Sequence, residues 1–277
     1  MKFRTVFFVS DQTGVTSETL GHSLLTQFDG LKFRGVTVPF INTLDKAREC
    51  VRRIDLTAQV EGTKPIVFAT LVHDELRQVI ATSKGLVLDF FDAFIGPLER
   101  ELHLRSSHAT GKAHGMSDSR SYTRRIDAMN YTLEHDDGAT TRDYDRADII
   151  LVGVSRSGKT PTCLYMALRY GVFAANYPLA EEEFETGQLP PVLARHRDRL
   201  FGLTISPRRL QQIRHERRPA SNYASARQVS FEIRSAEALF AKHGISYLDT
   251  TESSIEEIAS TVLDMTGLLN RMQEAAE

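Results

Sequence analysis

The chain has 277 residues, of which 41% are hydrophobic and 25% are charged, as in ordinary globular proteins. This composition excludes a fibrous or disordered protein and allows one large α/β domain or two smaller ones, of which we expect two. The net charge of -2 argues against a basic nucleic-acid-binding domain, so we expect no DNA or RNA partner.

The first part of the chain alternates short apolar runs with helix-like segments. We predict strands at 6–9, 35–40, 65–71 and 85–91, and helices after the first strand and at 45–59 and 73–83. Strands that alternate with helices predict a parallel sheet with helical crossovers. Residues 1–104 are therefore expected to form an N-terminal α/β domain.

Residues 105–121 interrupt this alternation. They are mostly small and polar, and we predict a linker or mobile loop. The histidines in and beside this segment, His103, His108 and His114, lack a cysteine or carboxylate at metal-ligand spacing. An exposed connection is therefore the interpretation that we prefer to a metal site.

The second half returns to an α/β pattern. We predict strands at 148–152, 172–177, 200–205 and 246–248, and helices at 122–133, 160–170, 207–217, 230–243 and 254–272. The last helix is amphipathic, with apolar residues at Ile255, Ile258 and Val262. Residues 122–277 are expected to form the second domain.

A phosphate-binding motif stands between the predicted strand 148–152 and the helix 160–170. Its eight residues are Gly153, Val154, Ser155, Arg156, Ser157, Gly158, Lys159 and Thr160, a full match to G-x-x-x-x-G-K-[ST]. The strand before it and the helix after it supply the context that this motif requires. We therefore predict an α/β protein with an N-terminal parallel-sheet half and a C-terminal P-loop kinase-like half that binds nucleotide at these eight residues.

Elementary chemistry assigns roles within this P-loop. The two glycines let the backbone curl around an anion, so that N–H groups and the start of the following helix face the phosphates. Lys159 is expected to neutralise charge on the transferred group, and Thr160 to offer its hydroxyl to Mg²⁺. For Arg156, at the loop tip, contact with phosphate and simple solvation are equally consistent with the sequence.

P-loop enzymes also need a carboxylate to hold the metal or accept a proton. The predicted strand 200–205 ends in Ser206 and not in aspartate. Asp249 is one candidate, and the pair Asp136-Asp137 beside His135 is another, for Mg²⁺ or for orienting a nucleophile. An Asp-Gly turn that closes the preceding helix explains this pair as well.

Two further groups have both a functional and a structural interpretation. Asp11, after the first strand, occupies the end of the sheet where α/β proteins place ligands, or it caps the next helix. A basic cluster either docks an acidic partner or a phosphate, or forms a solvated helix face. The cluster consists of Arg208, Arg209, Arg214, His215, Arg217 and Arg218.

Cysteine content and hydropathy indicate where the protein works. Cys50 and Cys163 lie in predicted helices without metal-ligand spacing, which is typical of a reduced compartment. The apolar stretch at the N-terminus is too short for a signal peptide, and no segment approaches the ~20 apolar residues of a membrane span. We expect a cytoplasmic protein without a membrane partner.

Several sequence segments together resemble one family, the bacterial phosphoenolpyruvate synthase regulatory proteins, over nearly the whole chain. These proteins are related to the regulators of pyruvate, phosphate dikinase. The segments are SD with a threonine at 10–13, YTLEHDDG at 131–138, GVSRSGKTPT at 153–162, AANYP at 174–178, FGLTI at 201–205 and SIEEIA at 254–259.

The resemblance implies a bifunctional enzyme. One activity is an ADP-dependent kinase that inactivates its target by phosphorylating a threonine. The other is a phosphorylase that removes this phosphate with inorganic phosphate and releases pyrophosphate. Phosphoenolpyruvate synthase is the implied protein substrate, ahead of pyruvate, phosphate dikinase. Within the family pattern, Asp137 becomes the preferred catalytic carboxylate beside Lys159, as base toward the threonine hydroxyl or as metal orienter. Thr160 and Asp136 are the expected metal ligands.

Other hypotheses are compatible with the P-loop itself. A small-molecule kinase or ATPase uses the same loop, and so does a nucleotide-sensing regulator without catalysis. The chain has no protein-kinase signature of glycine-rich loop, V-A-I-K lysine and H-R-D loop. The sequence decides neither the location of the phosphorylase site nor the assembly, for which a homodimer is one candidate.

Overall fold

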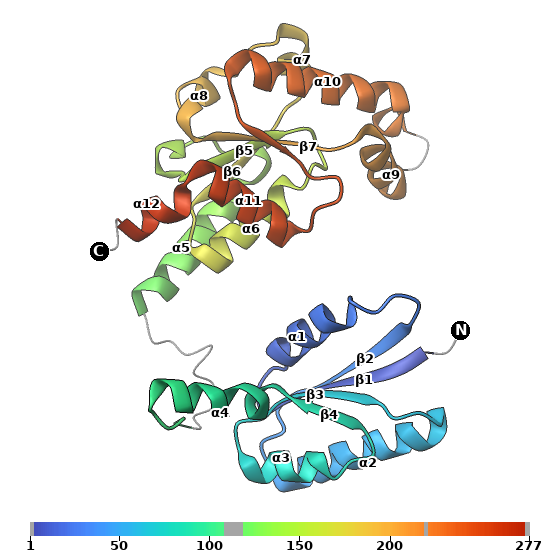
Figure 1. Cartoon of the computed structure of the whole chain (residues 1–277). Coiled ribbons are helices and arrows are strands. Elements are labelled where there is room, and N and C mark those ends of the chain that lie inside the picture. Colours follow the sequence, from blue (N-terminus) through green and yellow to red (C-terminus); the bar gives the residue numbers. More distant parts are fainter. Residues whose placement is uncertain (1–2, 108–118, 219–220, 275–277) are drawn as a thin grey trace. The chain divides into compact units, whose positions relative to one another are not determined.

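The computed structural model describes residues 3–107, 119–218 and 221–274. The chain divides into two compact units, Met1–Gly115 and Met116–Glu277, shown in Figure 1. The predicted linker at 105–121 falls mostly on residues 108–118, which lie outside those described, as do His108 and His114.

The N-terminal unit is a parallel sheet with helices on both faces (Figure 1). Its strand order is β2-β1-β3-β4, and every neighbouring pair is parallel. The strands are β1 (Phe3–Ser10), β2 (Lys32–Val38), β3 (Ile66–Thr70) and β4 (Leu86–Asp89), and the helices are α1 (Val15–Leu25), α2 (Leu44–Glu61), α3 (Asp74–Ala81) and α4 (Phe90–Leu102).

The first strand is apolar on both faces because both faces are covered. Phe7 and Val9 pack with residues of α2 and α3, whereas Val6 and Phe8 pack with α1 and with Phe68 of β3. This is why the sequence at β1 is a continuous apolar run instead of alternating between apolar and polar residues. Burial on both sides makes β1 the centre of the unit.

One helix of this unit is absent from the prediction. The strand predicted at 85–91 ends at Asp89, whose carboxylate accepts hydrogen bonds from Phe91 N (2.8 Å) and Asp92 N (3.0 Å) and so begins α4. This helix is hard to predict because it contains Pro97 directly after a glycine, a pair that usually interrupts helices.

The C-terminal unit repeats the same plan around a second parallel sheet, in the order β6-β5-β7-β8. The strands are β5 (Ile149–Gly153), β6 (Ala174–Pro178), β7 (Leu200–Thr204) and β8 (Tyr247–Asp249), and the helices are α5 (Ser119–Glu134), α6 (Lys159–Tyr170), α7 (Glu181–Thr186), α8 (Pro191–Ala194), α9 (Pro207–Arg217), α10 (Ala226–His243), α11 (Ile255–Thr266) and α12 (Leu268–Glu274). The predicted α/β class with two parallel-sheet halves is confirmed.

The faces of this sheet are covered by different helices. Ile150 and Val152 of β5 belong to a core with α9 and α10, whereas Ile149 and Leu151 belong to a core with α6 and α11. The single helix predicted at 254–272 is wrong, because α11 ends at Thr266, Gly267 caps it, and α12 begins at Leu268. Gly267 has a left-handed φ of 62°, a conformation that terminates helices and suits glycine.

Close packing of α1 on the sheet gives a stability prediction. A Cβ at Gly21 would lie 2.6 Å from ring carbons of both Phe8 and Phe68. Because the core has no room for the methyl group, we expect Gly21→Ala to destabilise the N-terminal unit by about 1–3 kcal/mol. Hydrogen exchange of the β1 amides measures this loss.

Ser23→Ala is the matched control, because Ser23 is an exposed residue of the same helix. It should change the opening free energy by less than about 0.5 kcal/mol. Equal protection of β1 in wild type and Gly21→Ala would show that α1 does not pack as described.

Candidate functional site

The P-loop octad forms the turn between β5 and α6, as its sequence context requires. Gly153 is needed because a Cβ there would lie 2.3 Å from the carbonyl oxygen of Leu203 on the neighbouring strand β7. Gly158 is needed for its left-handed φ of 96°, and a Cβ added to it would meet no atom within 4 Å. The space beside Gly158, just before α6, is therefore open.

Lys159 lies inside this loop and not on its surface. Only 4% of the residue is exposed, and its Nζ donates a hydrogen bond to the carbonyl oxygen of Val154 (3.0 Å). Burial lowers the pKa of Lys159 from 10.5 to about 8, and the negative charges of Asp137 and, more weakly, Asp136 oppose this shift. The ammonium group is thus held where an anion on the loop would meet it.

A carboxylate from another part of the chain reaches the start of α6. Asp136 Oδ1 accepts hydrogen bonds from Thr160 Oγ1 (2.7 Å) and from Asn176 Nδ2 (2.6 Å). Asn176, fully buried on β6, in turn accepts from Asp137 N (3.0 Å) through Oδ1. The turn after α5 is therefore fixed beside the P-loop by three hydrogen bonds.

Asp137 is the exposed member of the acidic pair. Its backbone is left-handed, with φ 48°, and the charge of its carboxylate is the largest of those that raise the pKa of Lys159. Asp137 and Gly138 form the turn that closes α5, as the interpretation of an Asp-Gly turn predicted. The turn does not exclude a catalytic or metal-binding role for the same carboxylates. The structure brings Asp136 and Asp137 to Lys159 and Thr160, and their chemical roles stay predictions.

His135, by contrast, is not available to a metal. Its ring nitrogens lie 2.7 Å from the backbone carbonyl oxygens of Tyr131 and Arg142, and the residue is buried. The hypothesis that His135 joins the acidic pair as a ligand is wrong. Its role is to hold the turn that carries Asp136.

The oxygen atoms of Thr160 and Asp136 suit Mg²⁺, which prefers hard oxygen ligands and usually takes the rest from water and substrate phosphates. The pair is already in hydrogen-bond contact, so a metal ion would find both groups on one side of the loop. Within residues 3–107, 119–218 and 221–274, no cluster of three or more His, Cys, Asp or Glu side chains offers a complete metal site.

A buried arginine supports the tip of the P-loop. Arg214 of α9 is fully buried and donates to Ser155 O (3.1 Å), Tyr223 O (3.1 Å) and Glu232 Oε2 (2.6 Å). The guanidinium also lies 4.0 Å from the centre of the Tyr223 ring, whose hydroxyl contacts Ser155 Oγ at 2.9 Å. Arg214 thus positions the loop from behind.

The basic cluster predicted from the sequence is wrong in one member. Arg214 is buried and so neither docks a partner nor is solvated, whereas the other members are exposed. The signal was present in the helical period, because Arg214 follows the buried Leu210 by one turn and so shares its face.

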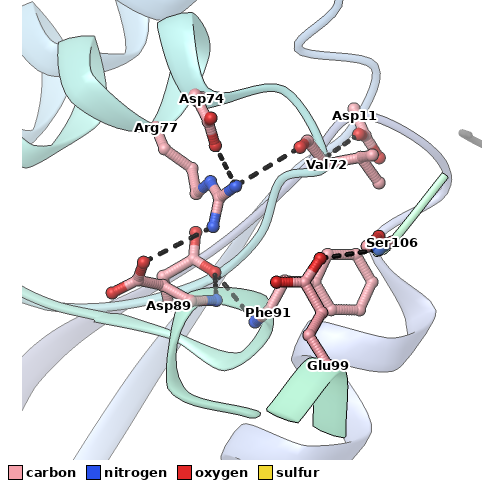
Figure 2. A network of polar contacts seen from close by, with 9 residues as sticks. Asp11, Val72, Asp74, Arg77, Asp89, Phe91, Glu99 and Ser106 are labelled. Atoms are coloured by element: carbon pink, nitrogen blue, oxygen red, sulfur yellow. Dashed lines mark hydrogen bonds and ion pairs between the residues drawn. The ribbon is translucent and has the colours of Figure 1, made fainter. Parts of the chain in front are cut away.

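The other predicted carboxylates are used elsewhere. Asp249 Oδ1 accepts from Thr251 N (2.9 Å) and closes the turn after β8. Asp11 accepts from Val72 N (2.9 Å) across the N-terminal sheet, as Figure 2 shows, and α1 starts at Gly14 without a side-chain cap. The interpretation of Asp11 as a helix cap is therefore wrong.

Figure 2 shows Arg77 at the same end of the N-terminal sheet, where the strands have their carboxyl ends. Its guanidinium pairs with Asp74 and lies 3.6 Å from Asp92, and it donates to the carbonyl oxygen of Val72 (3.4 Å). Burial raises the pKa of Asp89 nearby, against the hydrogen bonds from α4 that stabilise its charged form. These contacts join the loop after β3 to the start of α4.

Two further sequence expectations concern helices. Cys50 and Cys163 lie in α2 and α6, as predicted, and both are buried free thiols. In the part of the chain that the structure covers, no helix combines the length and the apolar character needed to cross a bilayer.

Comparison with known proteins gives a family and close relatives. The family model described as kinase/pyrophosphorylase matches residues 6–263. A phosphoenolpyruvate synthase regulatory protein of Alcanivorax borkumensis is 53% identical over 270 residues, 98% of this chain and 99% of that protein. Namesakes in Alkalilimnicola ehrlichii and Halorhodospira halophila are 52% and 54% identical, each over 97% of this chain and 98% of the relative. The resemblance found in the sequence is confirmed.

The buried ammonium gives a prediction about stability and pH. A change of pKa from 10.5 to about 8 corresponds to ~3 kcal/mol, the cost of keeping Lys159 charged in the folded state. Since the folded-state pKa is the lower one, this cost is present below pH 8 and disappears as the pH rises from about 8 to 10.5. We expect Lys159→Met to be more stable than wild type at pH 7 by an amount of this order.

Guanidinium chloride unfolding of both proteins at pH 7 and pH 9.5 measures the difference. The stability advantage of Lys159→Met should shrink at the higher pH, because wild type is then relieved of the charge. A difference that stays equal at both pH values would contradict a depressed pKa at Lys159.

Proposed function

This chain belongs to the kinase/pyrophosphorylase family, and from this premise we propose that it regulates phosphoenolpyruvate synthase by reversible phosphorylation. In one direction it transfers phosphate from ADP to a threonine of the synthase. In the other it removes that phosphate with orthophosphate and releases pyrophosphate. The names of the relatives support the synthase as protein substrate, ahead of pyruvate, phosphate dikinase.

The observation that carries this proposal is the contact of an acidic pair with a complete P-loop. Lys159 and Thr160 occupy the start of α6, and Asp136 is hydrogen-bonded to Thr160. A phosphoryl-transfer site needs a cation at the transferred group, a metal ligand and a carboxylate beside the nucleophile. Lys159 would supply the cation, Thr160 and Asp136 the metal ligands, and Asp137, in the turn after α5, the carboxylate.

In the kinase direction the β-phosphoryl group of ADP is transferred. The threonine Oγ attacks the β-phosphorus, a new P–O bond forms, and the bond to the bridging oxygen breaks so that AMP leaves. Lys159 and the loop N–H groups stabilise the charge on the phosphoryl oxygens. Mg²⁺, held by Thr160 and Asp136, would supply further charge neutralisation.

Asp137 serves as the base in this step. Asp137 is exposed and its negative charge acts on the ammonium group of Lys159, whereas Oδ1 of Asp136 accepts hydrogen bonds from Thr160 and Asn176. Asp137 accepts the proton of the threonine hydroxyl as the P–O bond forms. The hydrogen bonds thus separate the roles of the two residues. Asp136 is held by Thr160 and Asn176, and Asp137 accepts the proton.

The phosphorylase reaction fits the same residues. Orthophosphate attacks the phosphorus of phosphothreonine, the bond to Oγ breaks, and pyrophosphate forms while Oγ takes back a proton from Asp137. The attacking orthophosphate occupies the place that the phosphate of AMP leaves in the kinase reaction. We therefore propose one P-loop for both directions.

We place this enzyme in the cytoplasm with its target. Two free buried thiols and the absence of a membrane-spanning helix among the described residues support this location. A homodimer stays a prediction.

The central prediction concerns Lys159. Purified chain mixed with phosphoenolpyruvate synthase and ADP should phosphorylate a threonine of the synthase, and later addition of orthophosphate should release pyrophosphate. Lys159→Ala should abolish the incorporation of phosphate, because the transferred group loses its cation. Mass spectrometry of the synthase follows the threonine. Labelling at the wild-type rate by the variant would remove the P-loop from the kinase step.

A second prediction separates chemistry from binding at the acidic pair. Asp137→Asn should lower kcat in the kinase direction by about 10²–10⁴-fold, because the base is lost, while ADP binds as before. Asn176→Ala is the comparison, because it removes both side-chain hydrogen bonds that hold the turn and should impair the positioning of the acidic pair. Unchanged kcat in Asp137→Asn would assign the base to another group.

A further inference from the structure

A polar cavity lies at the carboxyl ends of β7 and β8. Its volume is about 610 Å³, and it lies between the loop that starts α9 and the loop that starts α11. We propose that this cavity holds the nucleoside of the ADP whose phosphates lie on the P-loop, an inference that rests on the proposed function. Its lining includes Ser206, Arg208, Arg209, Thr251, Glu252 and Ser253.

A residue next to the cavity lining joins it to the P-loop. Thr250, next to Thr251, donates through Oγ1 to the carbonyl oxygens of Ser157 (3.1 Å) and Thr204 (3.0 Å). Thr251 Oγ1 accepts from Ser206 N (2.8 Å) and connects the two loops that form the walls. A ligand that spans the P-loop and the cavity would therefore meet one preorganised surface.

The in-line geometry of phosphoryl transfer favours the side of the sheet where β7 and β8 end. The attacking and leaving oxygens stand roughly in line on opposite sides of the phosphorus. Asp136 and Asp137 lie beside β6, where Asn176 holds them, so the threonine approaches from that side. Because β5 stands between β6 and β7, the leaving AMP is directed toward the ends of β7 and β8.

The cavity combines charges of both signs. Its lining includes the cations of Arg208 and Arg209 and the carboxylate of Glu252. Two N–H groups of its walls are already bonded to neighbouring carboxylates: Ser254 N donates to Glu257 Oε2 (2.7 Å), and Thr251 N donates to Asp249 Oδ1 (2.9 Å). These two groups are not available to an anion, and the mixed charge suits a neutral nucleoside.

The same residues suit a base and a ribose. In the part of the chain that the structure describes, Arg208 has no hydrogen bond or ion pair, so its planar guanidinium is available to stack on a purine. Arg209, in contrast, is engaged with Gln212 Oε1 (3.2 Å). The carboxylate of Glu252 is an acceptor of the kind that binds ribose hydroxyls.

A functional consequence follows from the two reactions. ADP carries a nucleoside, whereas orthophosphate and pyrophosphate do not. The cavity therefore strengthens binding in the kinase direction only, and the P-loop serves both directions. Residues of the cavity set how strongly ADP competes with pyrophosphate for the loop.

Two variants and a control test the cavity in the full-length chain. Arg208→Ala removes the stacking group, and Ser253→Trp fills the space without removing a charge. Arg217→Ala changes an exposed arginine at the far end of the same helix and serves as control. Calorimetry measures the Kd of ADP and of pyrophosphate for each protein, and initial rates give KM for ADP and for orthophosphate.

We expect both cavity variants to weaken ADP binding by about tenfold, while the Kd of pyrophosphate changes less than about twofold. KM for ADP should rise with the Kd, and KM for orthophosphate should not. Equal losses for ADP and pyrophosphate would make the cavity a support of the P-loop, and no loss in either variant would place the nucleoside elsewhere. The binding data decide this even if phosphoenolpyruvate synthase proves not to be a substrate.

Discussion

The candidate site depends on one carboxylate, that of Asp136. Its oxygen Oδ1 joins Thr160 at the start of α6 to Asn176 on β6, and so fixes the turn after α5 against the P-loop. A hydrogen bond to a carboxylate is stronger than one between neutral groups, so two such bonds hold the turn firmly. Asp137, the next residue, is thereby placed where its charge acts on Lys159, and the proposed mechanism depends on that position.

The second constraint is the burial of positive charge under the loop. Lys159 is nearly inaccessible and Arg214 is fully buried, and each costs free energy to keep charged away from water. Arg214 is compensated by Glu232 and by backbone carbonyl oxygens. Lys159 has weaker compensation, which is why its pKa falls to about 8. The fold thus keeps a cation that is not fully paired at the place where a phosphate would complete the pairing.

Local chemistry predicted most secondary structure, and the failures have identifiable causes. The helix α4 was missed because Pro97 inside it gives the signal of a loop, and the break at Gly267 was missed because the apolar period continues across it. His135 was offered as a ligand, but its neighbours Tyr131 and Arg142 supply carbonyl oxygens that no sequence pattern displays. The deciding features were the cap at Asp89, the left-handed backbone of Gly267 and the carbonyl contacts of His135, and none of them is visible in the local sequence pattern.

The sequence by itself determined the P-loop, the α/β class and the family, because glycines, a lysine and a threonine at fixed spacing act through their own backbone and immediate neighbours. Only the tertiary structure decided which carboxylates lie near Lys159 and which arginine is buried. It also decided which side of β5, the one away from the acidic pair, is left for the rest of the nucleotide. The physical reason is that parallel strands far apart in the chain bring their carboxyl ends to one edge. Which loops meet there depends on strand order, β6-β5-β7-β8, and on hydrogen bonds between residues dozens of positions apart.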